Sequence, residues 1–225
     1  VATGAGRQPK VHRGMGLVSE VFTESVLTEL EGDIAVGHTR YATMGSTVLA
    51  NAQPILASSR EGALAIAHNG NLTNAARIRD ELVGSGSLFN SSSDSETIVH
   101  LIARSSAADP EGRIRDALGQ VTGAFSLIIL SGRTLYAVVD PHGFRPLALG
   151  RLGRGVVVAS ETCALDLMGA TLEQELAPGD FVRIDDGVIT RLAPLPAERV
   201  SRCVFELVYF ARPDSLLNGR AVYRA

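Results

Sequence analysis

The chain has 225 residues, of which 45% are hydrophobic and 20% charged, and its formal net charge is −3. This length fits one large domain or two small ones, and the hydrophobic fraction is sufficient for a buried core. The charge balance gives no basic patch of the kind that binds nucleic acid, and no apolar run is long enough to span a membrane, so neither partner is expected. Two cysteines argue against a disulfide framework, and residues 1–6 show no signal peptide, so a cytoplasmic protein is expected.

Seven short apolar segments bounded by Gly, Ser or Asp predict buried or half-buried strands. In chain order they cover residues 34–41, 63–68, 124–130, 134–140, 155–160, 181–184 and 188–192. Because Gly tolerates the positive φ of tight turns, Ser131-Gly132 and Asp185-Asp186-Gly187 are expected to be hairpin turns. Connections of this kind imply antiparallel sheets.

The sequence also predicts four helices, two of which carry recognisable start signals. Asn74 is expected to cap the first helix and Gly84 to end it. Ser93 and Glu96 have the spacing of a capping box at the start of the second. The four helices are expected over residues 75–83, from residue 93 onward, over residues 113–120 and from residue 161 onward.

Two antiparallel sheets with helices outside them predict an α+β fold, a four-layer αββα sandwich. The residue pattern changes after Pro194 and Pro196. Residues 1–200 are therefore expected to form the main domain. Residues 201–225 are expected to form a connector that leads into a further domain.

Asn69 and Gly70 follow a predicted strand, and a turn there would hold the Asn side-chain amide beside the Gly backbone N–H. Two fixed donors aimed at one point stabilise a tetrahedral oxyanion, and Gly lets a substrate approach the backbone closely. The plain alternative is an ordinary Asn-Gly turn. His68, at the end of the strand, is expected to line the same site.

Three further residues could hold a free amino acid next to these donors. Arg40 ends an apolar strand and suits an α-carboxylate, because its guanidinium binds carboxylates bidentately. Thr43 could add a hydroxyl to the same carboxylate, and Asp94 could receive the α-ammonium group. The alternatives are a surface Arg paired with a neighbouring acid and an Asp that only caps a helix. Together these groups suit an amino acid whose side-chain amide is being cleaved.

Other notable residues are interpreted as structural. Residues 140–147 predict a rigid turn in which Arg145 ties down an acid. Asp185-Asp186 could belong to a ribose-binding loop, but Gly187 leads directly into a strand, so a hairpin is preferred. Cys163 is expected to be a small buried residue on a helix. Cys203 has no second Cys nearby, so no metal site is completed within this chain.

Five strings resemble the amidophosphoribosyltransferases, a family of class II glutamine amidotransferases. They are GHTRYATMG at residues 37–45, HNGNLTN at 68–74, SSSDSE at 91–96, SETCALD at 160–166 and CVFELVYFARPDS at 203–215. The resemblance extends from His12 to Arg224, and the last string and residues 140–147 are the most specific to this family.

The resemblance implies an N-terminal-nucleophile glutaminase fold, here truncated at its N-terminus. In the family an N-terminal Cys attacks the glutamine amide with its own α-amine as base. The released ammonia passes through a channel to a phosphoribosyltransferase domain. There it converts phosphoribosyl pyrophosphate into 5-phosphoribosylamine, the first step of de novo purine synthesis. The matching motifs assign Asn69 and Gly70 to the oxyanion hole, and Arg40, Thr43 and Asp94 to glutamine binding.

The same resemblance sets expectations for cofactors and partners. The nucleophile lies before Val1 and the transferase domain begins within residues 201–225, so the fragment alone is expected to be inactive and to bind no cofactor. Mg²⁺ is expected in the transferase domain. A 4Fe–4S cluster occurs in some members, and Cys203 falls at the position of one ligand. Glutamine and phosphoribosyl pyrophosphate are the expected partners, and the full enzyme is expected to be a homo-oligomer.

Two alternatives remain open. The chain could come from another class II amidotransferase, of the glucosamine-6-phosphate or asparagine synthetase type, although residues 205–215 argue against it. It could also be a non-catalytic module that senses glutamine through Arg40 and Asp94.

Overall fold

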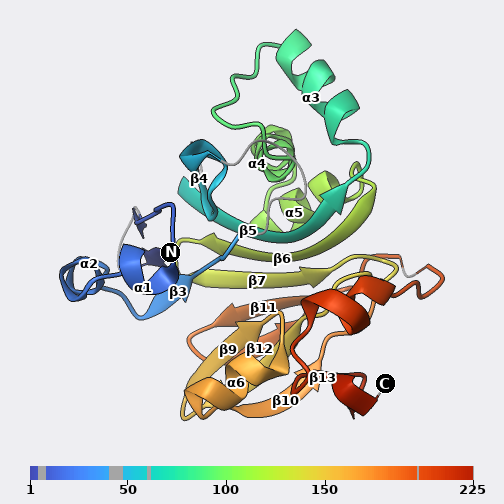
Figure 1. Cartoon of the computed structure of the whole chain (residues 1–225). Coiled ribbons are helices and arrows are strands. Elements are labelled where there is room, and N and C mark those ends of the chain that lie inside the picture. Colours follow the sequence, from blue (N-terminus) through green and yellow to red (C-terminus); the bar gives the residue numbers. More distant parts are fainter. Residues whose placement is uncertain (5–8, 41–47, 60–61, 197, 225) are drawn as a thin grey trace. The chain divides into compact units, whose positions relative to one another are not determined.

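The structure is a computed structural model of the chain, and it describes residues 1–4, 9–40, 48–59, 62–196 and 198–224. The chain divides into two compact units (Figure 1). Unit 1 consists of Val1–Gly123 and Ile129–Arg133, and unit 2 consists of Ala124–Ile128 and Thr134–Ala225. Strand β6 (Gly123–Ser131) contributes residues to both.

Unit 1 contains two groups of antiparallel strands besides its part of β6. A small sheet has the order β2-β1-β3, and β4 pairs with the long strand β5. The strands are β1 (Ala2–Gly4), β2 (Lys10–Val11), β3 (Ile34–Val36), β4 (Ile55–Ser59) and β5 (Gly62–Leu72). The helices are α1 (Val18–Val21), α2 (Glu24–Glu29), the 3-10 turn η1 (Leu49–Asn51), α3 (Ala75–Gly84), α4 (Ser95–Arg104) and α5 (Pro110–Leu118).

A helical layer covers the β4–β5 pair, with α4 packed against both strands and α5 against α4 (Figure 1). Ile98, Leu101 and Ile102 lie on the buried side of α4, as the helical spacing of these residues predicts. On the strand side, residues 63–68 of β5 are all buried. This continuous burial positions the next residues of β5, which carry the candidate site.

Unit 2 contains two groups of antiparallel strands, and in each group a central strand pairs with a strand on either side. Strand β11 lies between β7 and β12, and β8 lies between β9 and β10. The strands are β7 (Thr134–Val139), β8 (Ala148–Leu152), β9 (Gly155–Ala159), β10 (Thr171–Glu175), β11 (Phe181–Asp185), β12 (Val188–Arg191), β13 (Leu216–Leu217) and β14 (Arg220–Ala221). The helices are α6 (Thr162–Met168), the π-helical turn η2 (Glu206–Phe210) and the 3-10 turn η3 (Val222–Arg224).

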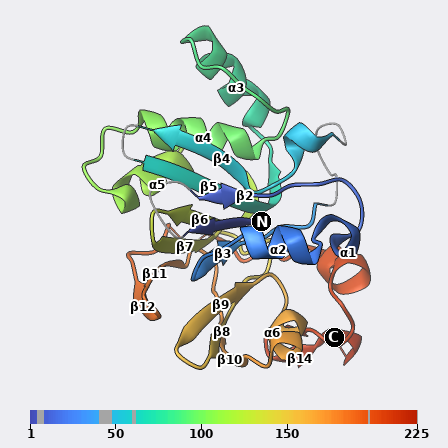
Figure 2. The ribbon, with the colours of Figure 1, turned by 90° about the vertical axis from the view of Figure 1, so that its left-hand side faces the viewer.

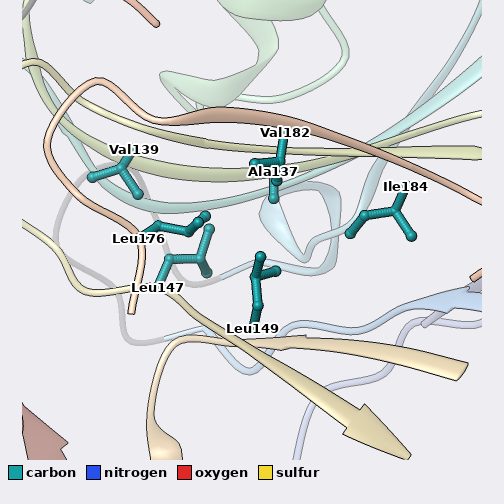
Figure 3. Close-up of a cluster of buried hydrophobic side chains, with 7 residues drawn as sticks. All are labelled: Ala137, Val139, Leu147, Leu149, Leu176, Val182 and Ile184. Atoms are coloured by element: carbon teal, nitrogen blue, oxygen red, sulfur yellow. The ribbon is translucent and has the colours of Figure 1, made fainter. Parts of the chain in front are cut away.

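The core of unit 2 lies between these two groups of strands. Figure 3 shows side chains of β7 and β11 meeting side chains of β8 and of the residues just before β8 and just after β10: Ala137, Val139, Leu147, Leu149, Leu176, Val182 and Ile184. Helix α6 lies against the sheet formed by β8, β9 and β10 (Figure 2). On this face Leu165 packs with Ala148 and Ala170. A Cβ at Gly150 would lie 2.9 Å from Leu165 Cδ2, so a larger residue there would displace the Leu165 side chain. Stacked antiparallel sheets with outer helices confirm the predicted α+β class.

Several local predictions are confirmed. Asp185 pairs with Val188 across a two-residue hairpin loop, in which Asp186 and Gly187 have φ of 46° and 76°. Such a primed turn needs positive φ at both positions. Cys163 is buried on α6, as predicted.

The two predicted capping interactions are wrong. Asn74 precedes α3, but its side chain makes no capping bond. Its amide nitrogen donates to Gln120 O at 2.9 Å, and its oxygen accepts from Thr122 N at 2.9 Å. The Glu96 carboxylate accepts the N–H groups of Asn90 and Ser91, each at 2.8 Å, instead of reaching back to Ser93. Both side chains bind a nearby loop rather than their own helix terminus.

The loop after β7 is organised by a buried acid. The carboxylate of Asp140 accepts three backbone N–H groups, from Phe125 at 3.2 Å, His142 at 2.8 Å and Phe144 at 3.1 Å. Burial is the main reason why the pKa of Asp140 is raised. Arg145 then binds Glu206, with 2.5 Å between Nη1 and Oε1. The predicted rigid turn, with Arg145 holding an acid, is confirmed.

Carboxylates also fasten residues 212–219 to the rest of unit 2. Glu161 accepts the Arg212 N–H and the Ser215 hydroxyl, both at 2.7 Å. Glu175 accepts the N–H groups of Asn218 at 2.9 Å and Gly219 at 2.8 Å. The assignment of residues 201–225 to the start of a further domain stays a prediction. Among the described residues, no helix has both the length and the apolar character to cross a membrane.

Candidate active site

Asn69 and Gly70 do not form the predicted turn. They lie inside β5, which continues to Leu72, four residues past the predicted strand end at His68. Gly70 has φ of 155°, a backbone conformation that favours glycine. The Asn-Gly signal for a turn is outweighed here because side chains on both sides of the dipeptide hold the extended backbone.

The backbone of His68, just before the dipeptide, is held by two side chains. Gln53 Oε1 accepts the His68 N–H at 2.6 Å, and Gln53 Nε2 donates to the His68 carbonyl at 3.2 Å. His38 Nε2 contacts the same carbonyl at 3.1 Å. A carbonyl has two lone pairs, so it accommodates both donors. His68 is 3% exposed and Gln53 8% exposed, so these bonds are protected from water.

His38 is a neutral donor in this arrangement. Burial is the main cause that lowers the pKa of His38 to about 4. Because the His68 carbonyl can only accept a hydrogen bond, His38 carries its ring proton on Nε2. The imidazole therefore fixes β5 without bringing a positive charge to it at neutral pH.

A second anchor lies just after the dipeptide. Asp94 Oδ2 accepts the Leu72 N–H at 2.9 Å, and the Thr73 N–H donates to the Thr122 carbonyl at 2.8 Å. Gly123 lets the backbones approach closely, since a Cβ there would lie 2.3 Å from Asn71 O. Residues 69–71 are thus bracketed by two fixed points.

The side chain of His68 connects β5 with the start of α4. His68 Nδ1 lies 2.9 Å from Ser95 Oγ and 3.8 Å from Asp94 Oδ1. Asp94 is 8% exposed and makes no side-chain capping bond to α4. A carboxylate has about four lone-pair positions, so the bond from Leu72 leaves acceptor capacity on Asp94.

The loop that precedes Asp94 is held by three side chains. Asn51, which is fully buried, accepts the Ser92 N–H at 2.8 Å and donates to the Ser92 hydroxyl at 2.9 Å. Glu96 holds residues 90 and 91, and Arg79 Nη2 donates to the Ser93 carbonyl at 3.0 Å. The position of Asp94 is therefore determined from both sides.

Arg40 lines a cavity of about 300 Å³ in unit 1. Among its other lining residues are Val1, His12, Arg13, His38 and Gln53. Asn69, Gly70 and Asp94 are not among the lining residues of this cavity, but His38 and Gln53 connect it to His68 and so to β5. Thr43 lies outside the described residues.

The dipeptide provides a side-chain amide and a backbone N–H, Arg40 a guanidinium and Asp94 a carboxyl group. Groups of this kind bind the polar atoms of small ligands. Sequence reasoning missed His38, Asn51 and Gln53, whose roles depend on contacts with residues 15–41 positions away. The one sequence signal is that two amide side chains, Asn51 and Gln53, stand just before strand β4.

The described residues do not hold a metal centre. No group of three or more His, Cys, Asp or Glu side chains in this part of the chain is arranged around a common ion position. A 4Fe–4S cluster needs four ligands, and the sequence has two cysteines, Cys163 and Cys203. Cys163 is buried on α6, whereas the half-buried Cys203 lines a cavity of unit 2. The chain by itself therefore does not fit a cluster.

Comparison with known proteins adds a family match. Residues 38–167 match the family described as "Glutamine amidotransferase domain". The chain is 49% identical over 213 residues to amidophosphoribosyltransferase 2, chloroplastic, of Arabidopsis thaliana, which covers 94% of the chain and 38% of that protein. It is 41% identical to the amidophosphoribosyltransferase of Bacillus subtilis over 222 residues, 98% of the chain and 46% of that protein.

A solved structure shows the same fold. The glutamine phosphoribosylpyrophosphate amidotransferase of B. subtilis, complexed with ADP and GMP, matches with a TM-score of 0.91 at 38% identity. The match covers 99% of this chain and 48% of that one. The chain thus spans less than half the length of these relatives.

Proposed function

Because the chain belongs to the glutamine amidotransferase domain family, we propose that it is the glutamine-hydrolysing part of an enzyme that makes 5-phosphoribosylamine. The full-length protein would use glutamine and phosphoribosyl pyrophosphate in the first step of de novo purine synthesis. The names of its relatives support this reading over the other class II amidotransferases. Its location would be the cytoplasm.

The observation that carries the proposal is the bracketed dipeptide of β5. Asn69 and Gly70 lie between a backbone held by Gln53 and one held by Asp94. Donors that are fixed before the reaction stabilise a developing oxyanion without reorganising, which is why such groups contribute strongly to catalysis. In the proposed mechanism the Asn69 amide and the Gly70 N–H receive the oxyanion formed on the glutamine side chain.

The remaining residues hold the substrate. The Arg40 guanidinium binds the α-carboxylate, with the Thr43 hydroxyl as a second donor, and Asp94 accepts from the α-ammonium group. A cysteine thiolate of the full-length protein attacks the side-chain amide, ammonia leaves, and water hydrolyses the thioester. The ammonia then displaces pyrophosphate from phosphoribosyl pyrophosphate in the transferase domain, where Mg²⁺ would bind.

Two features of the whole protein belong to the same proposal. Cys203 would be one ligand of a 4Fe–4S cluster whose other ligands lie in the rest of the protein. The full enzyme would be a homo-oligomer.

The test uses the full-length protein with glutamine or with ammonia as nitrogen donor. Asn69→Ala is expected to lower glutamine-dependent product formation by about 10²-fold or more, as for other oxyanion donors, while ammonia-dependent formation persists. Arg77→Ala, at an exposed side chain of the same unit, should leave both activities unchanged. Unchanged glutamine turnover in Asn69→Ala would falsify the oxyanion assignment. A protein that hydrolyses no glutamine would support the non-catalytic glutamine-binding alternative.

A further inference from the structure

Gln53 lies where a continuation of β4 would place a residue paired with β5. The β4–β5 register pairs Ile55 with Ile66, and an antiparallel register continues with one residue back on one strand for one residue forward on the other. Extended by two steps, it places Gln53 opposite His68. Pro54 stands between and has no N–H to continue the ladder.

The side chain of Gln53 makes the two bonds that the ladder would have made. In an antiparallel sheet, the two residues of a hydrogen-bonded pair exchange both N–H···O bonds. Gln53 accepts the His68 N–H with Oε1 and donates to the His68 carbonyl with Nε2. A primary amide has a donor and an acceptor side by side, so it can replace one backbone position of a neighbouring strand.

The same amide reaches the other anchor of the site. Gln53 Nε2 lies 3.4 Å from Ser95 Oγ, and Ser95 Oγ lies 3.4 Å from Asp94 Oδ1. His68 Nδ1 contacts the same hydroxyl at 2.9 Å. Gln53 is thus bonded to the residue before the oxyanion dipeptide and to the residue after Asp94.

From this geometry we propose that Gln53 is a positioning residue for the oxyanion donors. This inference rests on the proposed function, because it takes Asn69 and Gly70 as the oxyanion donors that Gln53 positions. The role assigned to Gln53 acts through the β5 backbone, which its side chain binds at His68. Gln53 fixes the β5 backbone one residue before Asn69, so that the Asn69 amide and the Gly70 N–H point to one place.

Asn51 provides a matched comparison two residues away. It is also a buried amide bonded to a backbone, but it holds Ser92, in the loop that delivers Asp94. The two amides should therefore affect different steps. Loss of Gln53 acts on the oxyanion donors and lowers kcat, whereas loss of Asn51 acts on substrate binding and raises KM.

The experiment measures steady-state glutamine hydrolysis by the full-length protein carrying Gln53→Met, Gln53→Glu or Asn51→Leu. Gln53→Met keeps the side-chain length and removes both bonds, and Gln53→Glu keeps the acceptor but loses the donor. A misplacement of about 1 Å costs up to about 10²-fold in rate. Both Gln53 variants should therefore lower kcat by about 10-fold or more, with KM within about 3-fold and ammonia-dependent activity retained. Asn51→Leu should raise KM more than it lowers kcat.

Two results would overturn the inference. One is a kcat within about 2-fold of the wild type in either soluble Gln53 variant. The other is a parallel loss of glutamine-dependent and ammonia-dependent activity in the Gln53 variants, which would assign Gln53 to general stability. The Gln53→Glu variant keeps the bond to the His68 N–H. If Gln53→Met does not fold, the kcat of Gln53→Glu tests the inference in its place.

The Asn69→Ala variant separates this inference from the proposed function. If Asn69→Ala lowers glutamine hydrolysis and Gln53→Met does not, only the role of Gln53 fails. If Asn69→Ala has no effect, the oxyanion assignment itself fails, whatever Gln53 does.

Discussion

Arg145 and Glu206 form a buried ion pair in unit 2, with 2.5 Å between Nη1 and Oε1 and side chains 14% and 9% exposed. Burial is the main reason why the pKa of Glu206 is raised, and Arg145 acts against this rise. Phe210 covers the guanidinium, whose Cζ lies 4.6 Å from the ring centroid. The pair connects the turn after β7 with η2, two segments 61 residues apart in sequence.

Removing one partner of this pair should destabilise unit 2. Arg145→Met leaves Glu206 buried without its cation, which typically costs about 3 kcal/mol or more. The double variant Arg145→Met with Glu206→Leu should recover most of the loss, because no buried charge remains. Urea unfolding of the wild type, both single variants and the double variant measures the coupling. As a control, Arg133→Met breaks a pair whose partners are 60% and 59% exposed, and its effect should be small. Equal effects of Arg145→Met and Arg133→Met would contradict the importance of burial.

A side chain at Gly123 should disturb the second anchor of β5. Gly123 has φ of 134°, and an added Cβ would lie 2.3 Å from Asn71 O and 2.9 Å from Leu72 Cα. Gly62→Ala is a matched control, since Gly62 has φ of 123° and no described atom lies within 4 Å of its added Cβ. Backbone strain alone costs roughly 1–3 kcal/mol. Gly123→Ala should cost more than Gly62→Ala in unfolding free energy and should also lower glutamine hydrolysis. Similar losses in both would show that strain, and not the close approach, determines the effect.

Acid should destabilise the chain through His38. The pKa of His38 is about 4 in the folded protein, whereas that of an exposed His is 6.5. Between pH 4 and pH 6.5 the unfolded state therefore binds more protons than the folded state. Stability consequently rises with pH through this window and falls as the pH drops from 6.5 toward 4. The shift of His38 corresponds to a loss on the order of 3 kcal/mol. His38→Gln keeps a donor and does not titrate. Its unfolding free energy should depend less on pH than the wild type over this window, and parallel curves would rule the explanation out.

Arg40 should determine glutamine affinity more than turnover. Arg40→Lys keeps the charge but loses the bidentate geometry, so the glutamine KM of the full-length protein should rise by about 10-fold or more with a smaller change in kcat. Arg77→Lys is the control, because Arg77 lies on the exposed face of α3 and pairs with Glu81 at 2.6 Å. A KM that stays at the wild-type value in Arg40→Lys would make Arg40 a structural residue.

The sequence predicted well those elements that depend on neighbouring residues. The hairpin at Asp186-Gly187 needs only two residues with positive φ, and strands β7, β9, β11 and β12 need only short apolar runs. Strands β1, β2, β4, β8, β10, β13 and β14 were missed. Of these, β1, β2, β13 and β14 are very short, and β8 contains Gly150. That glycine weakens the strand signal and is explained only by its contact with Leu165.

The errors at the candidate site arise from hydrogen bonds that the local residue types do not reveal. Asn74 and Glu96 have the residue types of helix caps, and Asn69-Gly70 has the composition of a turn. Asn74 and the dipeptide depart from their local patterns because polar groups distant in sequence supply bonds: Thr122 for Asn74, and Gln53 and Asp94 for the ends of the dipeptide. Glu96 instead binds the N–H groups of the loop just before its helix. The residue types of the site could therefore be predicted, but not the backbone that presents them.

A strand that is fastened by individual side chains can be tuned more finely than one paired along its whole length. Slipping a ladder by one residue turns every side chain to the opposite face. Exchanging Gln53 would instead alter only the side-chain bonds around His68 and Ser95. A single substitution at this position would change the backbone orientation of the Asn69-Gly70 dipeptide, while the β4–β5 pairing that supports it stays intact.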